Sequence, residues 1–162
     1  MAKGGGSGMR IEIIGDKELL TKLRQLGSAV AGNALKEAAM AGAEIVVDAA
    51  KARAPRRTGQ GAETIHAEFI DTKGDSITVD VGPDLKKGFH LKFVEFGTPP
   101  HTIRPKRKKA LAFPGGAHPV RVIHHPGTPA RPFMRPAIDE NEGRVRDKVG
   151  QVLKSKIDQV TR

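Results

Sequence analysis

The feature that most constrains the fold is a long alanine-rich stretch, residues 29–53, which reads AVAGNALKEAAMAGAEIVVDAAKAR. Alanine is the strongest helix former, and apolar residues recur along the stretch at the spacing of one helix face. Pro55 ends the pattern, because the residue before a proline avoids the helical region. Small side chains permit close approach of a neighbour, so the stretch predicts one long core helix packed on a sheet.

Short alternating segments predict the strands of that sheet. Residues 9–15 alternate apolar and polar positions and end at a glycine, as a short strand does. Residues 64–71 and 76–82 also alternate, and the intervening TKGD is typical of a hairpin turn. A leucine stripe predicts a short helix over residues 19–26. The apolar segment 89–97 is too short for its periodicity to separate a strand from one or two turns of helix.

The last third of the chain predicts a stiff connection and a final helix. Three prolines make residues 126–132 extended, and Pro136 suits the first turn of a helix about 25 residues long. One face of that helix is apolar and the other is charged. We therefore expect an α+β fold: a small, mainly antiparallel sheet packed against one long Ala-rich helix, a C-terminal amphipathic helix and a protruding basic hairpin loop.

The domain organisation follows from composition. Residues 1–8 are glycine-rich and read as a flexible N-terminal arm, or as a cloning remnant before a native start near Met9. Residues 9–162 are long enough for one domain with a modest core. Within it, residues 98–132 are expected to be an extended basic loop or hairpin insertion.

Positive charge is concentrated in one segment. The chain has a formal net charge of +10, and no Asp or Glu occurs from Phe96 to Ile138, where eight Lys and Arg residues lie. Residues 104–109, RPKRKK, hold five of them, and the short segments 110–113 and 120–124 are candidate strands of a hairpin. This pattern places the basic run at a hairpin tip. Charge of this size favours contact with a polyanion, although a charge run is more commonly a solvated loop.

Several classes of function are disfavoured. The chain has no cysteine, which excludes disulfides and thiolate metal sites, and no apolar run reaches the length of a membrane span. Four histidines, His101, His118, His124 and His125, lie in the acid-free segment, where no carboxylate could complete a zinc site. EFGTPP and HPGTPA are turn sequences without the Lys–Ser/Thr pair of a phosphate-binding loop. We expect no metal, no cofactor and no enzymatic activity.

Two groups of residues are candidates for interaction. If the basic segment faces DNA, it acts through phosphates and without base specificity. Its candidate residues are Arg104, Lys106, Arg107, Lys108, Lys109 and Arg121. The proline-rich lead-in to the last helix is either an anchor to the domain or to a neighbouring subunit, or only a stiff connection with Phe133 in the core. Candidate anchor or subunit-interface residues are Phe93, Phe96, Arg131, Phe133, Met134, Arg135 and Pro136.

The order of these motifs resembles a known family. The chain resembles the neck and tail-completion proteins of long-tailed phages, which are often labelled tail component or minor tail protein. The motifs that carry the resemblance are, in order, APRRTGQG after a long helix, FVEFGT, IRPKRKKALAF, and HPGTPARPFMRPAID before a terminal helix. The resemblance covers roughly residues 10–160. RRTGQGAETI departs from the family pattern, because it lacks the leucine usually found after the glycine.

The resemblance implies a structural virion protein made in the host cytoplasm. Its copies, six or twelve in common necks, would form a ring at the head–tail junction, between portal, connector or stopper proteins above and tail terminator or tail tube proteins below. Such a ring surrounds the DNA channel, can contact packaged DNA without specificity, and has no membrane partner. The alternative is a free, sequence-nonspecific nucleic-acid-binding protein. A toxin-like RNase is a poorer one, because no His/Glu/Arg constellation presents itself.

Overall fold

The computed structural model describes residues 9–14, 28–56, 59–73, 76–106, 110–112 and 118–160. The chain divides into two compact units, Met1–Leu91 with Phe133–Arg162, and Lys92–Pro132. The first unit holds a three-stranded sheet and the long helices, and the second holds a two-stranded ribbon.

The sheet of the first unit is antiparallel throughout, in the order β1-β3-β2. Its strands are β1 (Met9–Ile14), β2 (Ile65–Lys73) and β3 (Ser76–Pro83). Buried and half-buried residues alternate along the central strand β3, as expected for a strand with one face on the core. The predicted first strand and the predicted hairpin are both confirmed. The register of β2 on β3 shifts between Phe69 and Asp71, which is the position of a β-bulge.

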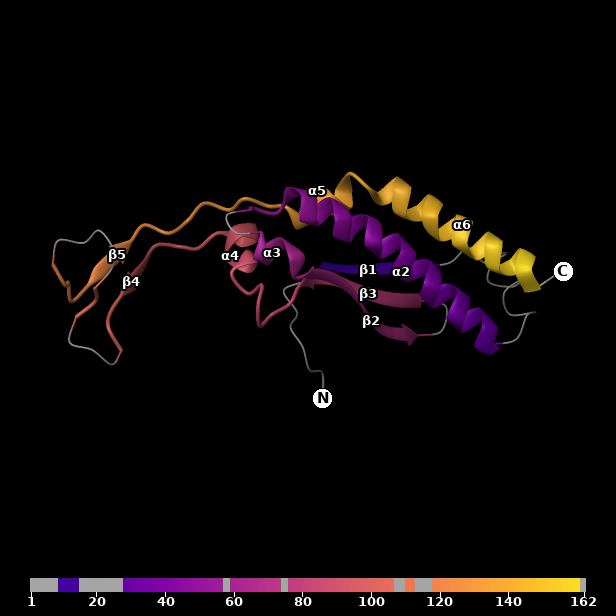
Figure 1. Cartoon of the computed structure of the whole chain (residues 1–162), viewed down its shortest axis with the longest axis horizontal. Helices are drawn as coiled ribbons and strands as arrows, with labels where there is room; N and C mark the ends of the chain where they lie inside the picture. Colours follow the sequence, from indigo (N-terminus) through magenta and orange to yellow (C-terminus); the bar gives the residue numbers. More distant parts are fainter. Residues whose placement is uncertain are drawn as a thin grey trace. The chain divides into compact units, whose positions relative to one another are not determined.

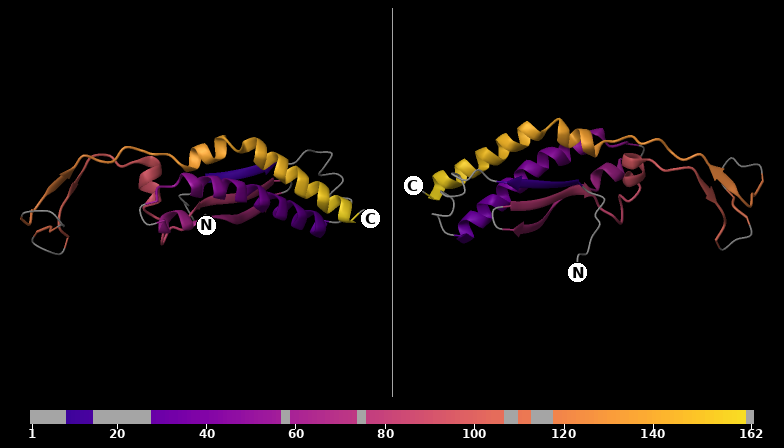
Figure 2. Two further views of the ribbon diagram at one scale, coloured as in Figure 1. Left: turned by 45° about the horizontal axis from the view of Figure 1, so that its top comes forward. Right: turned by 180° about the vertical axis from the view of Figure 1, so that it is seen from behind.

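Helix α2 (Ser28–Arg53) lies across one face of this sheet, as the alanine-rich pattern predicts (Figure 1). Helix α6 (Glu142–Val160) runs alongside α2 and packs on it (Figures 1 and 2). Among the described residues, no helix covers the opposite face of the sheet, which we call the open sheet face.

The contact between α2 and α6 depends on small residues of α2. Ala34 and Ala38 are buried against Val149 and Leu153 of α6. One turn further along α2, a Cβ placed on Gly42 would lie 2.8 Å from Cγ2 of Val149. That distance is shorter than a normal carbon–carbon contact, so only glycine lets the two helices approach this closely.

The final helix differs from the prediction, because it is broken. Helix α5 (Met134–Asp139) ends before Glu140, and α6 begins at Glu142. The buried side chain of Asn141 stabilises the break: its Nδ2 donates to the carbonyl oxygen of Ala137 at 2.9 Å, and its Oδ1 accepts from Arg144 at 2.8 Å. An asparagine that bonds local backbone competes with the helical hydrogen bonds, and apolar periodicity does not report this.

Ion pairs join α2 to the C-terminal helices. Lys156 on α6 pairs with Glu37 at 2.6 Å, and Arg53 at the end of α2 pairs with Glu140 at the break. Both pairs are partly exposed, so each contributes modestly to stability. With helix and antiparallel strand segregated in this way, the α+β class is confirmed. The helix predicted over residues 19–26 lies outside the described residues.

Two short helices complete the described elements. Helix α3 (Gln60–Glu63) is a single turn that follows Gly59, whose φ is +77°. Helix α4 (Leu91–Phe96) occupies the apolar segment whose type the sequence leaves open. Leu91 and Glu95 of α4 are buried, while Phe93 and Phe96 are exposed. This i, i+4 spacing of buried residues is the helical period, and a strand would have buried alternate positions instead.

Candidate functional site: a basic ribbon

The second unit contains an antiparallel ribbon, which we define as residues 97–129. Its base is formed by two copies of the sequence Gly-Thr-Pro, residues 97–99 and 127–129. The backbone N–H of Thr98 donates to the carbonyl of Thr128 at 2.9 Å, and the N–H of Thr128 donates to the carbonyl of Thr98 at 3.0 Å. The two turns therefore close on each other symmetrically.

Both glycines of this base are required by its geometry. Gly97 has a φ of +69° and Gly127 a φ of +87°, a region that side chains with a Cβ rarely adopt. A Cβ on Gly127 would lie 2.3 Å from the carbonyl oxygen of Thr98, and one on Gly97 would lie 2.6 Å from that of Thr128. The sequence analysis interpreted EFGTPP and HPGTPA as separate turns. Their repetition was the available signal that they pair.

Beyond the base, β4 (His101–Ile103) pairs with β5 (Ile123–His125). The rings of His101 and His125 stack across the strands with their centroids 5.0 Å apart. Nδ1 of His101 lies 2.9 Å from the carbonyl oxygen of Pro99, and the N–H of Gly127 donates to Nδ1 of His125 at 3.0 Å. Both rings thus satisfy backbone groups at the ribbon edges, which is a structural role.

Pairing in the ribbon continues on both sides of the basic run in the chain. After the pair Ile103↔Ile123, the next pairing is the bridge Leu111↔Val120, with seven residues between on one strand and two on the other. The described residues 104–106 and 110 thus lie in the chain between two paired points of the ribbon. Local patterning could not show this pairing, because the partners of residues 101–103 lie 20 to 24 positions away in the chain.

The structure exposes the described members of the predicted polyanion-facing group. The side chains of Arg104, Lys106 and Arg121 are all exposed. Arg107, Lys108 and Lys109 lie outside the described residues. The ribbon carries six Lys and Arg residues and no Asp or Glu. None of its described residues is buried, so this part of the ribbon has no core of its own.

The predicted anchor residues divide into exposed and buried groups. Phe93 is 45 % exposed and Phe96 is 71 % exposed, although both are large apolar side chains. Phe133 and Met134, at the start of α5, are each only 3 % exposed and belong to the first unit. The remaining three are Arg131 and Arg135, which are exposed, and Pro136, which is half-buried. The backbone N–H of Arg131 donates to the carbonyl of Val94 at 2.8 Å, which ties the end of the second unit to α4.

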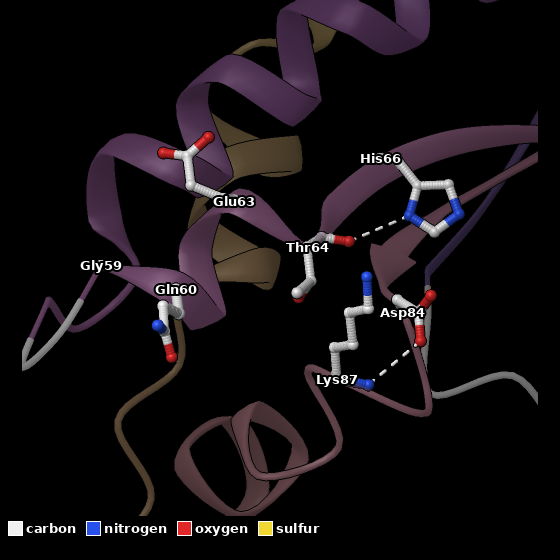
Figure 3. Close-up of a pocket in the computed structure, with 7 residues that line it drawn as sticks. All are labelled: Gly59, Gln60, Glu63, Thr64, His66, Asp84 and Lys87. Atoms are coloured by element: carbon white, nitrogen blue, oxygen red, sulfur yellow. Dashed lines mark hydrogen bonds between the residues drawn. The ribbon is translucent and has the colours of Figure 1, made fainter.

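The first unit also has an open pocket of about 970 Å³ beside α3 and the end of β3 (Figure 3). It is lined by Gly59, Gln60, Glu63, Thr64, His66, Asp84 and Lys87. Nδ1 of His66 lies 3.0 Å from the carbonyl oxygen of Thr64. No nucleophile and base are brought together here. Among the described residues, no three His, Cys, Asp or Glu side chains are placed to hold a metal ion, and no helix is long and apolar enough to cross a membrane.

Asp84 organises the turn at one side of this pocket. Its Oδ1 accepts from the backbone N–H groups of Lys86 at 2.6 Å and of Lys87 at 3.1 Å. These two hydrogen bonds favour the carboxylate and lower the pKa of Asp84 below its ordinary value of 3.8.

We expect Asp84→Asn to lower the urea midpoint slightly at pH 7. Because the pKa of Asp84 is lower in the folded chain, the ionised carboxylate stabilises the fold at pH values above the ordinary pKa of 3.8. This stabilisation is lost as the pH falls through the pKa of the folded state. The difference between Asp84→Asn and the natural protein should therefore shrink below pH 3.8. Urea titrations of the two proteins at pH 7 and below pH 3.8 test this prediction. An equal difference between their urea midpoints at the two pH values would contradict it.

Comparison with known proteins identifies the family. The model of the family described as "Bacteriophage HK97-gp10, putative tail-component" matches residues 17–97, half of the chain. The chain belongs to this family, in agreement with the resemblance to phage neck and tail-completion proteins. Membership supports a structural role in the phage tail or neck and a place in the virion.

The matched region covers α2, the β2–β3 hairpin and α4, and it stops where the ribbon begins. The ribbon and the helices α5 and α6 therefore lie outside the match. No curated protein and no solved structure matches the chain.

Proposed function

We propose that this protein is a structural subunit of the phage neck. Copies of it form a ring that joins the head connector to the tail and surrounds the DNA channel, with six or twelve copies per ring. Family membership supports the virion role. The observation that carries the finer proposal is the ribbon, which has six cations, no acid and, among its described residues, no buried side chain. Such a segment gains stability from an anionic surface that it touches.

The chemistry of the ribbon suits a channel or an acidic neighbour better than a specific ligand. Lys and Arg attract phosphates or carboxylates without reading bases, which a passage for DNA of any sequence requires. The residues that we assign to this contact are Arg104, Lys106, Arg107, Lys108, Lys109 and Arg121. Portal, connector or stopper proteins above the ring and tail proteins below it are the expected neighbours.

A second set of residues is proposed to hold subunits or segments together. Exposed Phe93 and Phe96 on α4 offer apolar area of the kind that protein interfaces bury. Arg131, Phe133, Met134, Arg135 and Pro136 are proposed to anchor the start of the C-terminal helices. Buried Phe133 and Met134 support this part of the proposal.

Charge reversal tests the role of the basic run. We expect replacement of Arg104, Lys106, Arg107, Lys108 and Lys109 by glutamate to leave thermal unfolding unchanged, because the described side chains of this run are exposed. Phage carrying the variant should lose infectivity and accumulate unjoined heads and tails. Plaque counts and electron microscopy of lysates measure both effects.

A matched control reverses Lys148 and Lys154 on the exposed face of α6. This control should join heads to tails normally. If the variant with all five replacements produces normal virions at normal yield, the basic run is only solvated. Mass photometry and negative-stain imaging of the protein with its neighbours test the ring itself, and a protein that stays monomeric in their presence refutes it.

The alternative, a free nucleic-acid-binding protein, is favoured by the same acid-free ribbon. It predicts that the isolated monomer binds duplex DNA, with a plot of log affinity against log salt whose slope is about −0.9 for each phosphate neutralised. Five contacts would give a slope of roughly −4 to −5. The neck proposal predicts weak binding by the monomer and rings with its neighbours, so a salt titration by fluorescence anisotropy separates the two.

A further inference from the structure

The ribbon requires a surface that covers it. Isolated two-stranded ribbons are marginally stable in water, and this one has a regular ladder of only three pairs, His101–Ile103 with Ile123–His125. Six positive charges without a negative charge add repulsion within the ribbon. A covering surface should therefore supply carboxylates and some apolar area.

Strand β2, at the edge of the sheet in the first unit, offers both. The Nζ atom of Lys36 on α2 lies 4.5 Å from the centre of the Phe69 ring, so Phe69 faces the helix. Glu68 precedes Phe69 on β2 and therefore lies on the opposite side of the sheet. Ile70 is the bulged residue that follows Phe69, and it is 44 % exposed.

Carboxylates flank this exposed isoleucine. Glu68 and Asp71 are both exposed, and Asp71 pairs with Thr78, which lies between the buried Ile77 and Val79. Asp80 lies opposite Glu68 in the register and also opposite Arg10 of β1. At the bulge of the edge strand β2, Ile70 is thus an exposed apolar side chain that lies near carboxylates of the open sheet face.

The ribbon presents the complementary arrangement. Val122 is 39 % exposed, and Arg121 precedes it in the chain. Arg104 and Val122 are the next residues on the two strands after the pair Ile103↔Ile123. Ile70 and Val122 are thus exposed aliphatic side chains whose charged neighbours have opposite signs, carboxylates around Ile70 and guanidinium groups around Val122.

We propose that the ribbon of one copy docks on the open sheet face of the next copy, with Val122 against Ile70 and with Arg104 and Arg121 beside Glu68 and Asp71. This inference rests on the proposed ring and names the contact that builds it. The two surfaces are different, so the contact is heterologous. Each copy uses its ribbon to contact one neighbour and its open sheet face to contact the other. Repetition with closure gives a ring, which a contact between identical surfaces does not.

Engineered cysteines test this contact directly, because the natural chain has none. A disulfide requires the two Cα atoms to lie within about 7 Å of each other. Under mild oxidation of the full-length protein with its neck partners, the double variant Ile70→Cys, Val122→Cys should form a ladder of covalent oligomers on a denaturing gel. The single variants should stop at dimers.

A pairing of Val122→Cys with Ser155→Cys on α6 is the matched control, and it should form no ladder. If rings assemble but the Ile70–Val122 pair does not crosslink, the inference is overturned while the ring proposal stands. A crosslink within one chain also overturns it, because the ribbon then lies on its own sheet. If no rings assemble, both proposals fail.

Charge exchange gives an independent readout of the same contact. Arg104→Glu with Arg121→Glu should raise the concentration needed for half assembly by at least about tenfold, and so should Glu68→Arg with Asp71→Arg. Combining all four changes should restore most of the assembly, because the charges on the two surfaces are again opposite in sign. Full assembly by either pair alone, with loss only of DNA binding, would assign the ribbon to DNA and overturn the contact.

Discussion

Replacement of Gly127 by alanine is expected to open the base of the ribbon. Alanine at a φ of +87° costs about 1–2 kcal/mol, and its Cβ would lie 2.3 Å from the carbonyl oxygen of Thr98. That oxygen is the acceptor of one of the two hydrogen bonds that close the base, so it cannot move away without losing the bond. The combined cost exceeds the stability of a marginal two-stranded ribbon.

Hydrogen exchange followed by mass spectrometry measures this effect in the full chain. Peptides that contain Thr98 or Thr128 should lose their protection, while peptides of α2 and β3 keep theirs, because those elements belong to the other unit. Gly143→Ala is the matched control, since a Cβ there meets nothing within 4 Å. Unchanged protection at Thr98 and Thr128 would mean that the Gly-Thr-Pro pair does not hold the ribbon together.

Gly42→Val is expected to destabilise the first unit as a whole. The added side chain would begin 2.8 Å from Val149 and 3.1 Å from Val145, at a point where α2 and α6 are packed on each other. Overpacking of this kind costs about 1–3 kcal/mol. In a chain of this size each kcal/mol lowers Tm by about 2–4 °C, so Tm should fall by several degrees.

The same helix supplies the control for this prediction. Gly32 also lies inside α2, but a Cβ there meets nothing within 4 Å. Gly32→Ala should therefore raise stability by roughly 0.5–1 kcal/mol through helix propensity alone. Circular dichroism melts of the two variants should shift in opposite directions. A shift of Gly42→Val in the same direction as Gly32→Ala would show that the helices are not closely packed at Gly42.

The elements were predictable where their information is local. Helix α2, strand β1 and the β2–β3 hairpin were all expected from periodicity, from Pro55 and from the turn between the two hairpin strands. The break at Asn141 was not expected, because apolar residues continue on one face through it. Only the hydrogen bonds of the buried Asn141 side chain with Ala137 and Arg144 show why the chain turns there.

The candidate site was predictable in composition, but the pairing of its strands was not. The acid-free segment and its cations are visible directly in the sequence, and so are the two copies of Gly-Thr-Pro. What could not be read is that Thr98 pairs with Thr128, because cross-strand partners are chosen by the folded chain and not by neighbouring residues.

The sequence by itself determined which segments are helical or extended, where charge is concentrated, and which family the chain resembles. The helical and extended segments and the concentration of charge follow from the chemistry of adjacent residues, which acts over one or two turns of chain, whereas the resemblance rests on the order of motifs along the whole chain. The tertiary structure alone decided the packing of α6 on α2, the open sheet face, the close approach at Gly42 and the pairing within the ribbon. Each of these is a contact between residues far apart in sequence, and such contacts are set by packing and hydrogen bonding across the whole fold.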